Sequence, residues 1–133
     1  MPLRAQSHRS SDGLITLVVE APQEPESAGL QDWIVGTLPG PWHTHPDLLA
    51  AESGIEPSEA VDRFIEGVLD DSFPLVLYYD NGRLEEVSVR YTEYESLDAF
   101  EESEQRWMSS RHKIIVRTWS GSVIREIVPR GLE

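Results

Sequence analysis

The sequence predicts an α+β domain in which an antiparallel sheet is covered by two helices, in the order ββαββαββ. Two observations carry this prediction. The first is an Asn-Gly pair between two apolar runs, which is the strongest short-range signal of a β-hairpin. The second is a stretch after Pro57 in which apolar residues recur at helical spacing. Hairpins interleaved with helices are typical of α+β folds.

The length of 133 residues fits one domain with its own core. Residues 1–13 are mostly polar, and we expect them to form a flexible arm ahead of a single domain over residues 14–133. The chain has no cysteine, which excludes disulfides, thiolate metal sites and a cysteine nucleophile. Its apolar runs are much shorter than the roughly 20 residues of a membrane span, so we expect a soluble, cytoplasmic protein that does not engage membranes.

The sequence of the first part of the domain predicts two strands followed by a sharp turn. Residues 14–21 are apolar and rich in β-branched side chains, as in a buried strand. Residues 32–37 form a second expected strand. Pro39-Gly40-Pro41 then forces a turn that leads to Trp42 and to a pair of histidines.

The clearest helix begins at Pro57. Its apolar residues fall at i, i+3, i+4, i+7 and i+8, while charged residues occupy the other face. The apolar face is predicted to lie against a sheet that contains Leu75, Leu77, Val87 and Val89. The residues of this face are Val61, Phe64, Ile65, Val68 and Leu69.

Two hairpins and a second helix complete the predicted fold. Residues 74–79 and 84–91 flank Asn81-Gly82, which suits a type I′ turn because both central positions need a positive φ. Ser96 is a good N-cap for a helix that ends near Ser109 and carries Trp107 on its apolar side. The last two strands, residues 111–119 and 123–128, are joined by a Ser-Gly-Ser turn.

The net charge of −13 is unevenly distributed along the chain. Residues 24–104 hold 20 acidic residues against three arginines, whereas residues 105–133 hold six basic residues against two acidic ones. Such an acidic middle disfavours nucleic acid, whose phosphates require clustered Lys and Arg. The expected partners are therefore cations, metals or basic protein surfaces.

The densest run of acids gives the predicted binding surface. Five glutamates, together with Tyr94, are predicted to form a negative patch, which we call the 93–104 patch. Inhibitors and immunity proteins that block basic partners use the same electrostatic steering. We therefore expect a small acidic binding or inhibitor-type domain, without a cofactor, that acts on a basic protein partner. The glutamates are Glu93, Glu95, Glu101, Glu102 and Glu104.

The histidine pair supports an alternative function. In an extended segment, His43 and His45 point to the same side of the backbone and are able to share one metal ion. Zinc needs at least one further protein ligand, and a catalytic zinc also needs an open position and a general base. The chain offers many carboxylates for these roles.

The segment Gly40-Pro41-Trp42-His43-Thr44-His45-Pro46 resembles the signature of the JAMM/MPN family of zinc metallopeptidases. In that family a strand ends in His-Ser/Thr-His-Pro, and a Ser-x-x-Asp follows at the start of a helix. Here seven residues separate His45 from Ser53, as in the family, but Glu56 stands where the family has its aspartate. The resemblance implies a zinc-dependent peptidase, with the imidazoles of the motif as ligands. It also implies Glu56 as third ligand, Ser53 as support for the tetrahedral intermediate and Glu20 as general base.

Overall fold

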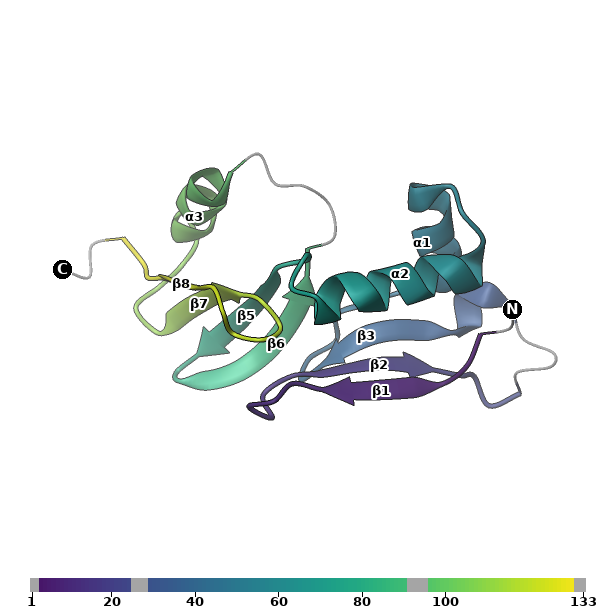
Figure 1. Ribbon diagram of the computed structural model, residues 1–133. Helices are drawn as coiled ribbons and strands as arrows, with labels where there is room; N and C mark the ends of the chain where they lie inside the picture. The colour runs from purple at the N-terminus through teal and green to yellow at the C-terminus, as the bar shows by residue number, and fades with distance from the viewer. Residues whose placement is uncertain (1–2, 25–28, 91–95, 131–133) are drawn as a thin grey trace.

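The computed structural model describes residues 3–24, 29–90 and 96–130. Within these ranges the chain forms two four-stranded antiparallel sheets, three α-helices and one short 3-10 helix (Figure 1). The α+β class is thereby confirmed. The single sheet and two helices of the predicted order are replaced by two sheets and three helices.

The first sheet has the strand order β1-β2-β3-β4, and a 3-10 helix, η1 (Leu30–Asp32), precedes its third strand. The expectation of a flexible arm over residues 1–13 is wrong for part of that segment, because β1 pairs antiparallel with β2 from Gln6↔Val19 to Arg9↔Thr16. The β1 sequence, Gln-Ser-His-Arg, has no apolar alternation, so only the backbone pairing reveals the strand. The strands are β1 (Gln6–Arg9), β2 (Thr16–Glu20), β3 (Ile34–Leu38) and β4 (His43–Thr44).

The second sheet has the order β6-β5-β7-β8 and contains both predicted hairpins. In the β5–β6 turn, Asn81 has φ 53° and Gly82 has φ 78°, as a type I′ turn requires. The strands β5 and β7 pair in the centre of the sheet, so the second hairpin extends the first. The strands are β5 (Leu75–Asp80), β6 (Arg83–Val89), β7 (His112–Arg117) and β8 (Ile124–Ile127).

The helices are α1 (Pro46–Ser53), α2 (Pro57–Leu69) and α3 (Leu97–Gln105). The sequence pattern did not predict α1, because this short helix has no single apolar stripe. It begins with Pro46 in its first turn and ends at Gly54, whose φ of 71° suits glycine. The predicted N-cap of α3 is confirmed, since the Ser96 hydroxyl accepts a hydrogen bond of 3.0 Å from the Ala99 amide.

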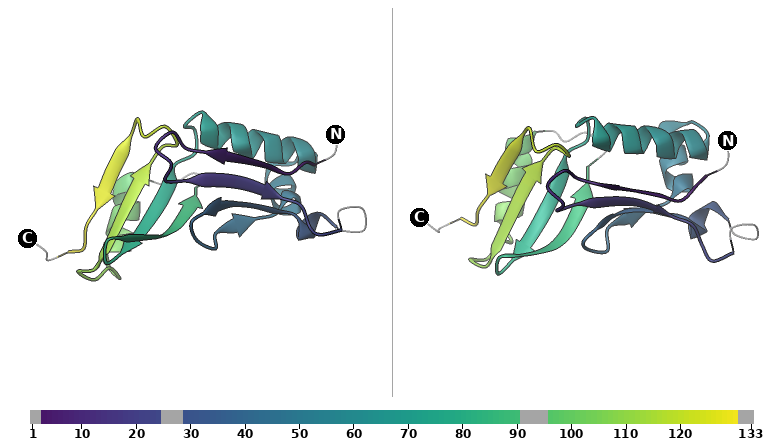
Figure 2. Two further views of the ribbon diagram at one scale, coloured as in Figure 1. Left: turned by 90° about the horizontal axis from the view of Figure 1, so that it is seen from below. Right: turned by 60° about the horizontal axis from the view of Figure 1, so that its bottom comes forward.

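The helix α2 packs over residues from both sheets, and it lies along the first sheet in Figures 1 and 2. The predicted packing is confirmed for Val61, Phe64, Ile65 and Val68, which share one core cluster with Leu75, Leu77, Val87 and Val89. The same cluster includes Leu17 and Val19 of β2, Val35 of β3 and Ile15, which immediately precedes β2. Leu69 differs from the prediction, since it is 36% exposed at the end of α2.

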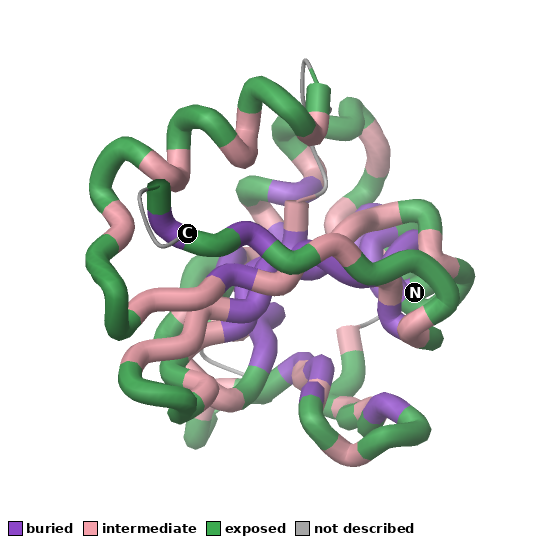
Figure 3. Tube along the Cα trace, turned by 90° about the vertical axis from the view of Figure 1, so that its left-hand side faces the viewer, coloured by how far each residue is buried: buried purple, intermediate pink, exposed green. Residues whose placement is uncertain are grey.

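The helix α3 covers the second sheet at the end of the molecule away from α1 (Figures 1 and 2). Its Leu97 and Phe100 pack on a second cluster, formed by Val76, Ile114, Val116 and Ile127, although no residue of α3 is itself buried (Figure 3). The helix ends at Gln105, short of the predicted end. Trp107 therefore lies beyond the helix, and at 51% exposure it is not the core residue that helical spacing predicted.

Close backbone contacts join the two sheets between β3 and β6. The Thr37 hydroxyl donates to the Val87 carbonyl, and the Val87 amide donates to the Pro39 carbonyl at 3.1 Å. Gly40, with φ 106°, lies so near β6 that a Cβ atom there would stand 2.7 Å from the Glu86 Cα. Only glycine satisfies both the conformation and this approach.

Candidate functional site

The two histidines of the predicted metal motif lie side by side. The strand β4 places His43 opposite Gly36 of β3, and the intervening Thr44 is buried at 4% exposure. The ring centroids of His43 and His45 are 5.1 Å apart, with their planes at 89°. The prediction that both imidazoles project to the same side is therefore confirmed.

Backbone carbonyls fix the orientation of both rings. Nδ1 of His43 donates to the Pro41 carbonyl at 2.9 Å, and Nδ1 of His45 donates to the Trp33 carbonyl at 2.7 Å. Because a carbonyl oxygen only accepts, each Nδ1 carries a hydrogen and each neutral ring keeps its lone pair on Nε2. Rings held in this way are oriented as metal-binding histidines usually are.

The other residues that the resemblance implies do not join this pair in a metal site. Across residues 3–24, 29–90 and 96–130, no three His, Asp or Glu side chains are grouped so that they could hold a metal ion. Glu20 borders the same shallow hollow as His43, at the exposed end of β2. Ser53 donates its hydroxyl hydrogen to the Leu49 carbonyl at 2.7 Å, and Glu56 is the residue that precedes α2. Among the described residues, the structure therefore places His43 and His45 in direct ring contact without a third ligand grouped with them.

The 93–104 patch is described only in part, because Glu93 and Glu95 lie outside the described residues. Its three remaining glutamates are on α3, and each contacts another residue of this chain. Glu101 forms an ion pair with Arg125, and Glu104 accepts a hydrogen bond from the Trp107 indole. Glu102 lies 3.8 Å from Arg106 and 3.7 Å from Arg130.

Arginines after residue 105 provide the ion-pair contacts of Glu101 and Glu102. Strand β8 places Arg125 beneath α3, where it donates to Asp98 at 2.7 Å and also to Glu101. These hydrogen bonds, that to Asp98 first, raise the pKa of Arg125 above its usual range. Three of the basic residues after residue 105, Arg106, Arg125 and Arg130, therefore offset Asp98, Glu101 and Glu102 of α3. The sequence could not reveal this, because it does not show which helix the last strand approaches.

A different acidic surface lies on α1 and α2. Residues 46–71 hold eight acidic residues and a single base, Arg63, which pairs with Glu59 at 3.0 Å on the exposed side of α2. In α2 the acids recur every three or four residues, which places them on one face. We call six of these residues, all exposed, the α1–α2 acidic surface: Glu52, Glu56, Glu59, Asp62, Glu66 and Asp70.

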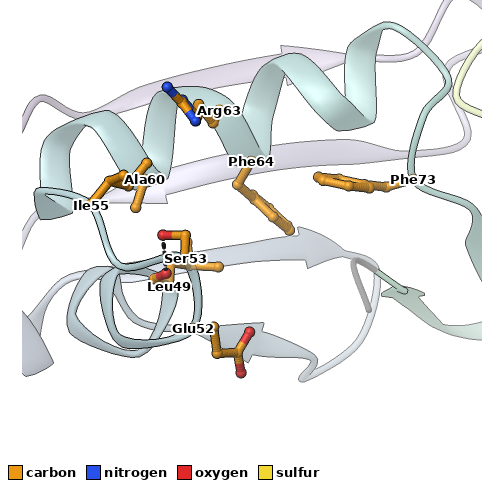
Figure 4. Close-up of a pocket in the computed structure, with 8 residues that line it drawn as sticks. All are labelled: Leu49, Glu52, Ser53, Ile55, Ala60, Arg63, Phe64 and Phe73. Carbon is orange, nitrogen blue, oxygen red and sulfur yellow. Dashed lines mark hydrogen bonds between the residues drawn. The ribbon is translucent and has the colours of Figure 1, made fainter. Parts of the chain in front are cut away.

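A pocket of about 310 Å³ opens between α1 and α2 beside this surface (Figure 4). Glu52, Ser53 and Arg63 supply its polar lining. The rest of the lining is apolar. In Figure 4 the rings of Phe64 and Phe73 lie next to each other below α2, with their centroids 6.1 Å apart. The apolar lining residues are Leu49, Ile55, Ala60, Phe64 and Phe73.

Glycine positions shape this pocket. A Cβ atom on Gly67 of α2 would lie 2.2 Å from the Phe73 ring, so only glycine lets that ring rest against the helix. The Phe73 amide also donates to the Gly67 carbonyl at 3.0 Å. Gly54 adopts the left-handed conformation that ends α1 before α2 begins. Local sequence patterns do not indicate this pocket, because they do not predict α1, which forms one side of it.

None of the helices in the described part of the chain is long and apolar enough to cross a bilayer. The sequence matches no model of a known protein family, and neither curated proteins nor solved structures gave a match. The function is therefore inferred from the side chains and geometry of this protein alone.

Proposed function

We propose that the protein is a binding domain that docks a basic protein through the α1–α2 acidic surface. The observation that supports this proposal is the charge of that surface, which presents six exposed acids with Arg63 as the sole base of residues 46–71. A predominantly negative surface attracts a positively charged partner and accelerates its association. The net charge of −13 also favours the approach of a positively charged partner.

The 93–104 patch fits the same function less well. Arg125, Arg106 and Arg130 already form ion pairs with acids of α3, namely Asp98, Glu101 and Glu102. A basic partner would have to compete with these arginines, which are part of the same chain and therefore always present. In the α1–α2 acidic surface, Glu59 pairs with Arg63, which is the only Lys or Arg in residues 46–71 of the sequence.

The zinc-dependent peptidase is supported less well than the binding domain. His43 and His45 are oriented as ligands, but a catalytic zinc site usually has three protein ligands. Within the described ranges no carboxylate completes such a group with them. We therefore do not propose a hydrolytic reaction for this site.

A pair of matched charge reversals tests the proposed function. Asp62→Lys/Glu66→Lys changes two acids four residues apart on α2, and Asp98→Lys/Glu102→Lys changes two acids four residues apart on α3. The probe is a short lysine-rich peptide that carries one leucine, titrated by fluorescence anisotropy at several salt concentrations. The circular dichroism spectrum of each variant checks its folding.

We expect the α2 reversal to weaken peptide binding by roughly tenfold and to flatten its salt dependence, because two attractive charges become repulsive. The α3 reversal should leave binding within about twofold, since those acids are already offset. Folding should persist in both variants because exposed charges contribute little to stability. Equal losses in both variants, or a loss only in the α3 variant, would contradict the proposal.

A further inference from the structure

The pocket between α1 and α2 exposes apolar surface that the fold itself does not cover. Its floor consists of well-buried side chains, since Leu49, Ala60 and Phe64 are 5%, 4% and 3% exposed. Its walls, Ile55 and Phe73, are only partly buried. Apolar surface in a concave site gains free energy when an apolar group displaces water from it.

The size of the pocket favours a small occupant. At about 310 Å³ it lies at the lower end of ligand-sized pockets, which span roughly 300–1,000 Å³. One aliphatic or aromatic side chain fits such a space, whereas an extended lipid chain or a large cofactor requires more room. Binding anchors at protein interfaces are often single apolar side chains in pockets of this kind.

The charge around the pocket indicates what must flank that side chain. Glu52 belongs to the lining itself, and Glu59 holds the lining residue Arg63 at 3.0 Å. Glu56 is exposed in the short connection between the two helices that form the pocket. An occupant with a carboxylate or phosphate would meet repulsion here, whereas one flanked by Lys or Arg would be attracted.

From this combination we infer that the pocket receives one aliphatic or aromatic side chain of a basic polypeptide, with its Lys or Arg neighbours lying on the α1–α2 acidic surface. The inference rests on the proposed function and adds the chemistry of the docked segment. The apolar side chain supplies the anchor, and the flanking cations supply orientation and fast association.

Ring packing holds Phe64 of the pocket floor and Phe73 of its wall in place. Phe64 packs against Trp42 on one side, with a centroid separation of 6.2 Å, and against Phe73 on the other. Gly67 keeps the Phe73 ring against α2. A pocket that is already formed does not have to be ordered when the partner binds, so less of the binding free energy is lost.

The test uses two lysine-rich peptides that differ only by one leucine or alanine at the central position. Ser53→Phe places a ring at the edge of the pocket, and Ala51→Phe places the same ring on an exposed position of α1 outside the lining. The Ser53 hydroxyl bonds only within α1 among the hydrogen bonds described, so its loss should not disturb the fold. Thermal unfolding of both variants checks this.

We expect the leucine peptide to bind wild type at least about tenfold more tightly than the alanine peptide, because it buries one large apolar side chain. Ser53→Phe should abolish this preference, and Ala51→Phe should retain it. A preference that survives Ser53→Phe, or equal affinities in wild type, would overturn the inference.

The charge reversal on α2 distinguishes a failure of the inferred apolar anchor from a failure of the proposed binding function. If both peptides bind equally, with a salt dependence that Asp62→Lys/Glu66→Lys removes, the anchor is overturned while the basic-partner function stands. If neither peptide binds in a salt-dependent way, the anchor and the proposed function are both overturned.

Discussion

Arg117 of β7 donates from Nη1 to Oδ2 of Asp12 at 2.6 Å, which ties the second sheet to the turn between β1 and β2 of the first. The Arg117 side chain is only 6% exposed. Its other nitrogens donate to the carbonyls of Thr118 and Trp119, each at 2.9 Å. Ser10 donates to the same carboxylate at 2.6 Å. A nearly buried guanidinium thus links two sheets whose strands are far apart in sequence.

This link predicts acid sensitivity. The hydrogen bonds from Ser10 and Arg117 lower the pKa of Asp12 from 3.8 to about 2. Because the folded pKa lies below the unfolded one, Asp12 stabilises the fold above about pH 4 and loses this contribution as the pH falls towards 2.

Asp12→Asn should therefore lower the free energy of unfolding near neutral pH by about 1–2 kcal/mol. This is less than the full pKa shift would give, because the Asp12 side chain is 40% exposed and solvent screens its charge. The difference from wild type should shrink as the pH approaches 2. Urea unfolding across a pH series measures it, with the exposed Asp62→Asn as control. A difference that does not change with pH would contradict this role of Asp12.

Phe64 is the second test of the fold. It is 3% exposed and lies in the main core, where it also forms part of the pocket floor. We expect Phe64→Ala to lower the free energy of unfolding by roughly 3–5 kcal/mol, because a large buried side chain is removed. Leu69→Ala, at a position 36% exposed, should cost much less. A loss below about 1 kcal/mol at Phe64 would show that α2 does not pack as described.

Replacing Gly67 with alanine is expected to destabilise the protein, which is the opposite of what helix propensity alone predicts. An alanine in the middle of a helix is normally favoured over glycine by about 1 kcal/mol. Here the added Cβ would stand 2.2 Å from the Phe73 ring, so the ring must move.

We therefore expect Gly67→Ala to destabilise the protein by about 1–3 kcal/mol, as overpacking does. In a Phe73→Ala background the same substitution should regain its normal favourable effect. Chemical denaturation of the four proteins in this double-mutant cycle measures both effects. Stabilisation by Gly67→Ala in the wild-type background would show that Phe73 does not rest on α2.

The histidine pair leads to a metal prediction. We expect protein purified without a histidine tag to contain much less than one zinc per chain, because a stable zinc site needs ligands beyond His43 and His45. Elemental analysis after dialysis measures the content. Stoichiometric zinc that disappears in His43→Ala would support the peptidase function instead.

Local patterns predicted part of this fold. The apolar stripe of α2, the Asn81-Gly82 turn and the Ser96 cap each depend on neighbouring residues, and the structure contains all three. The strand β1 and the helix α1 lack such patterns, because their residues are mostly polar or without a single apolar face. The division into two sheets depends on which distant strands pair, and short-range periodicity does not contain that information.

The same distinction applies to the candidate site. In an extended segment, side chains two positions apart lie on the same side of the backbone. The spacing of His43 and His45 was therefore enough to predict that they lie close together. The contact of Arg125 with Glu101 joins residues far apart in the chain, and only the folded structure places them together. The pocket is formed by residues of both α1 and α2, so a sequence pattern that does not indicate α1 cannot predict it.

The most direct test of the binding function is to map the contact surface of the lysine-rich leucine peptide on isotopically labelled protein by amide chemical shifts. We expect the largest shifts at the end of α1 and in α2, around Ser53, Ile55 and Phe64, with only small shifts on α3. Shifts concentrated on α3 and Trp107, or an absence of shifts at saturating peptide, would contradict it.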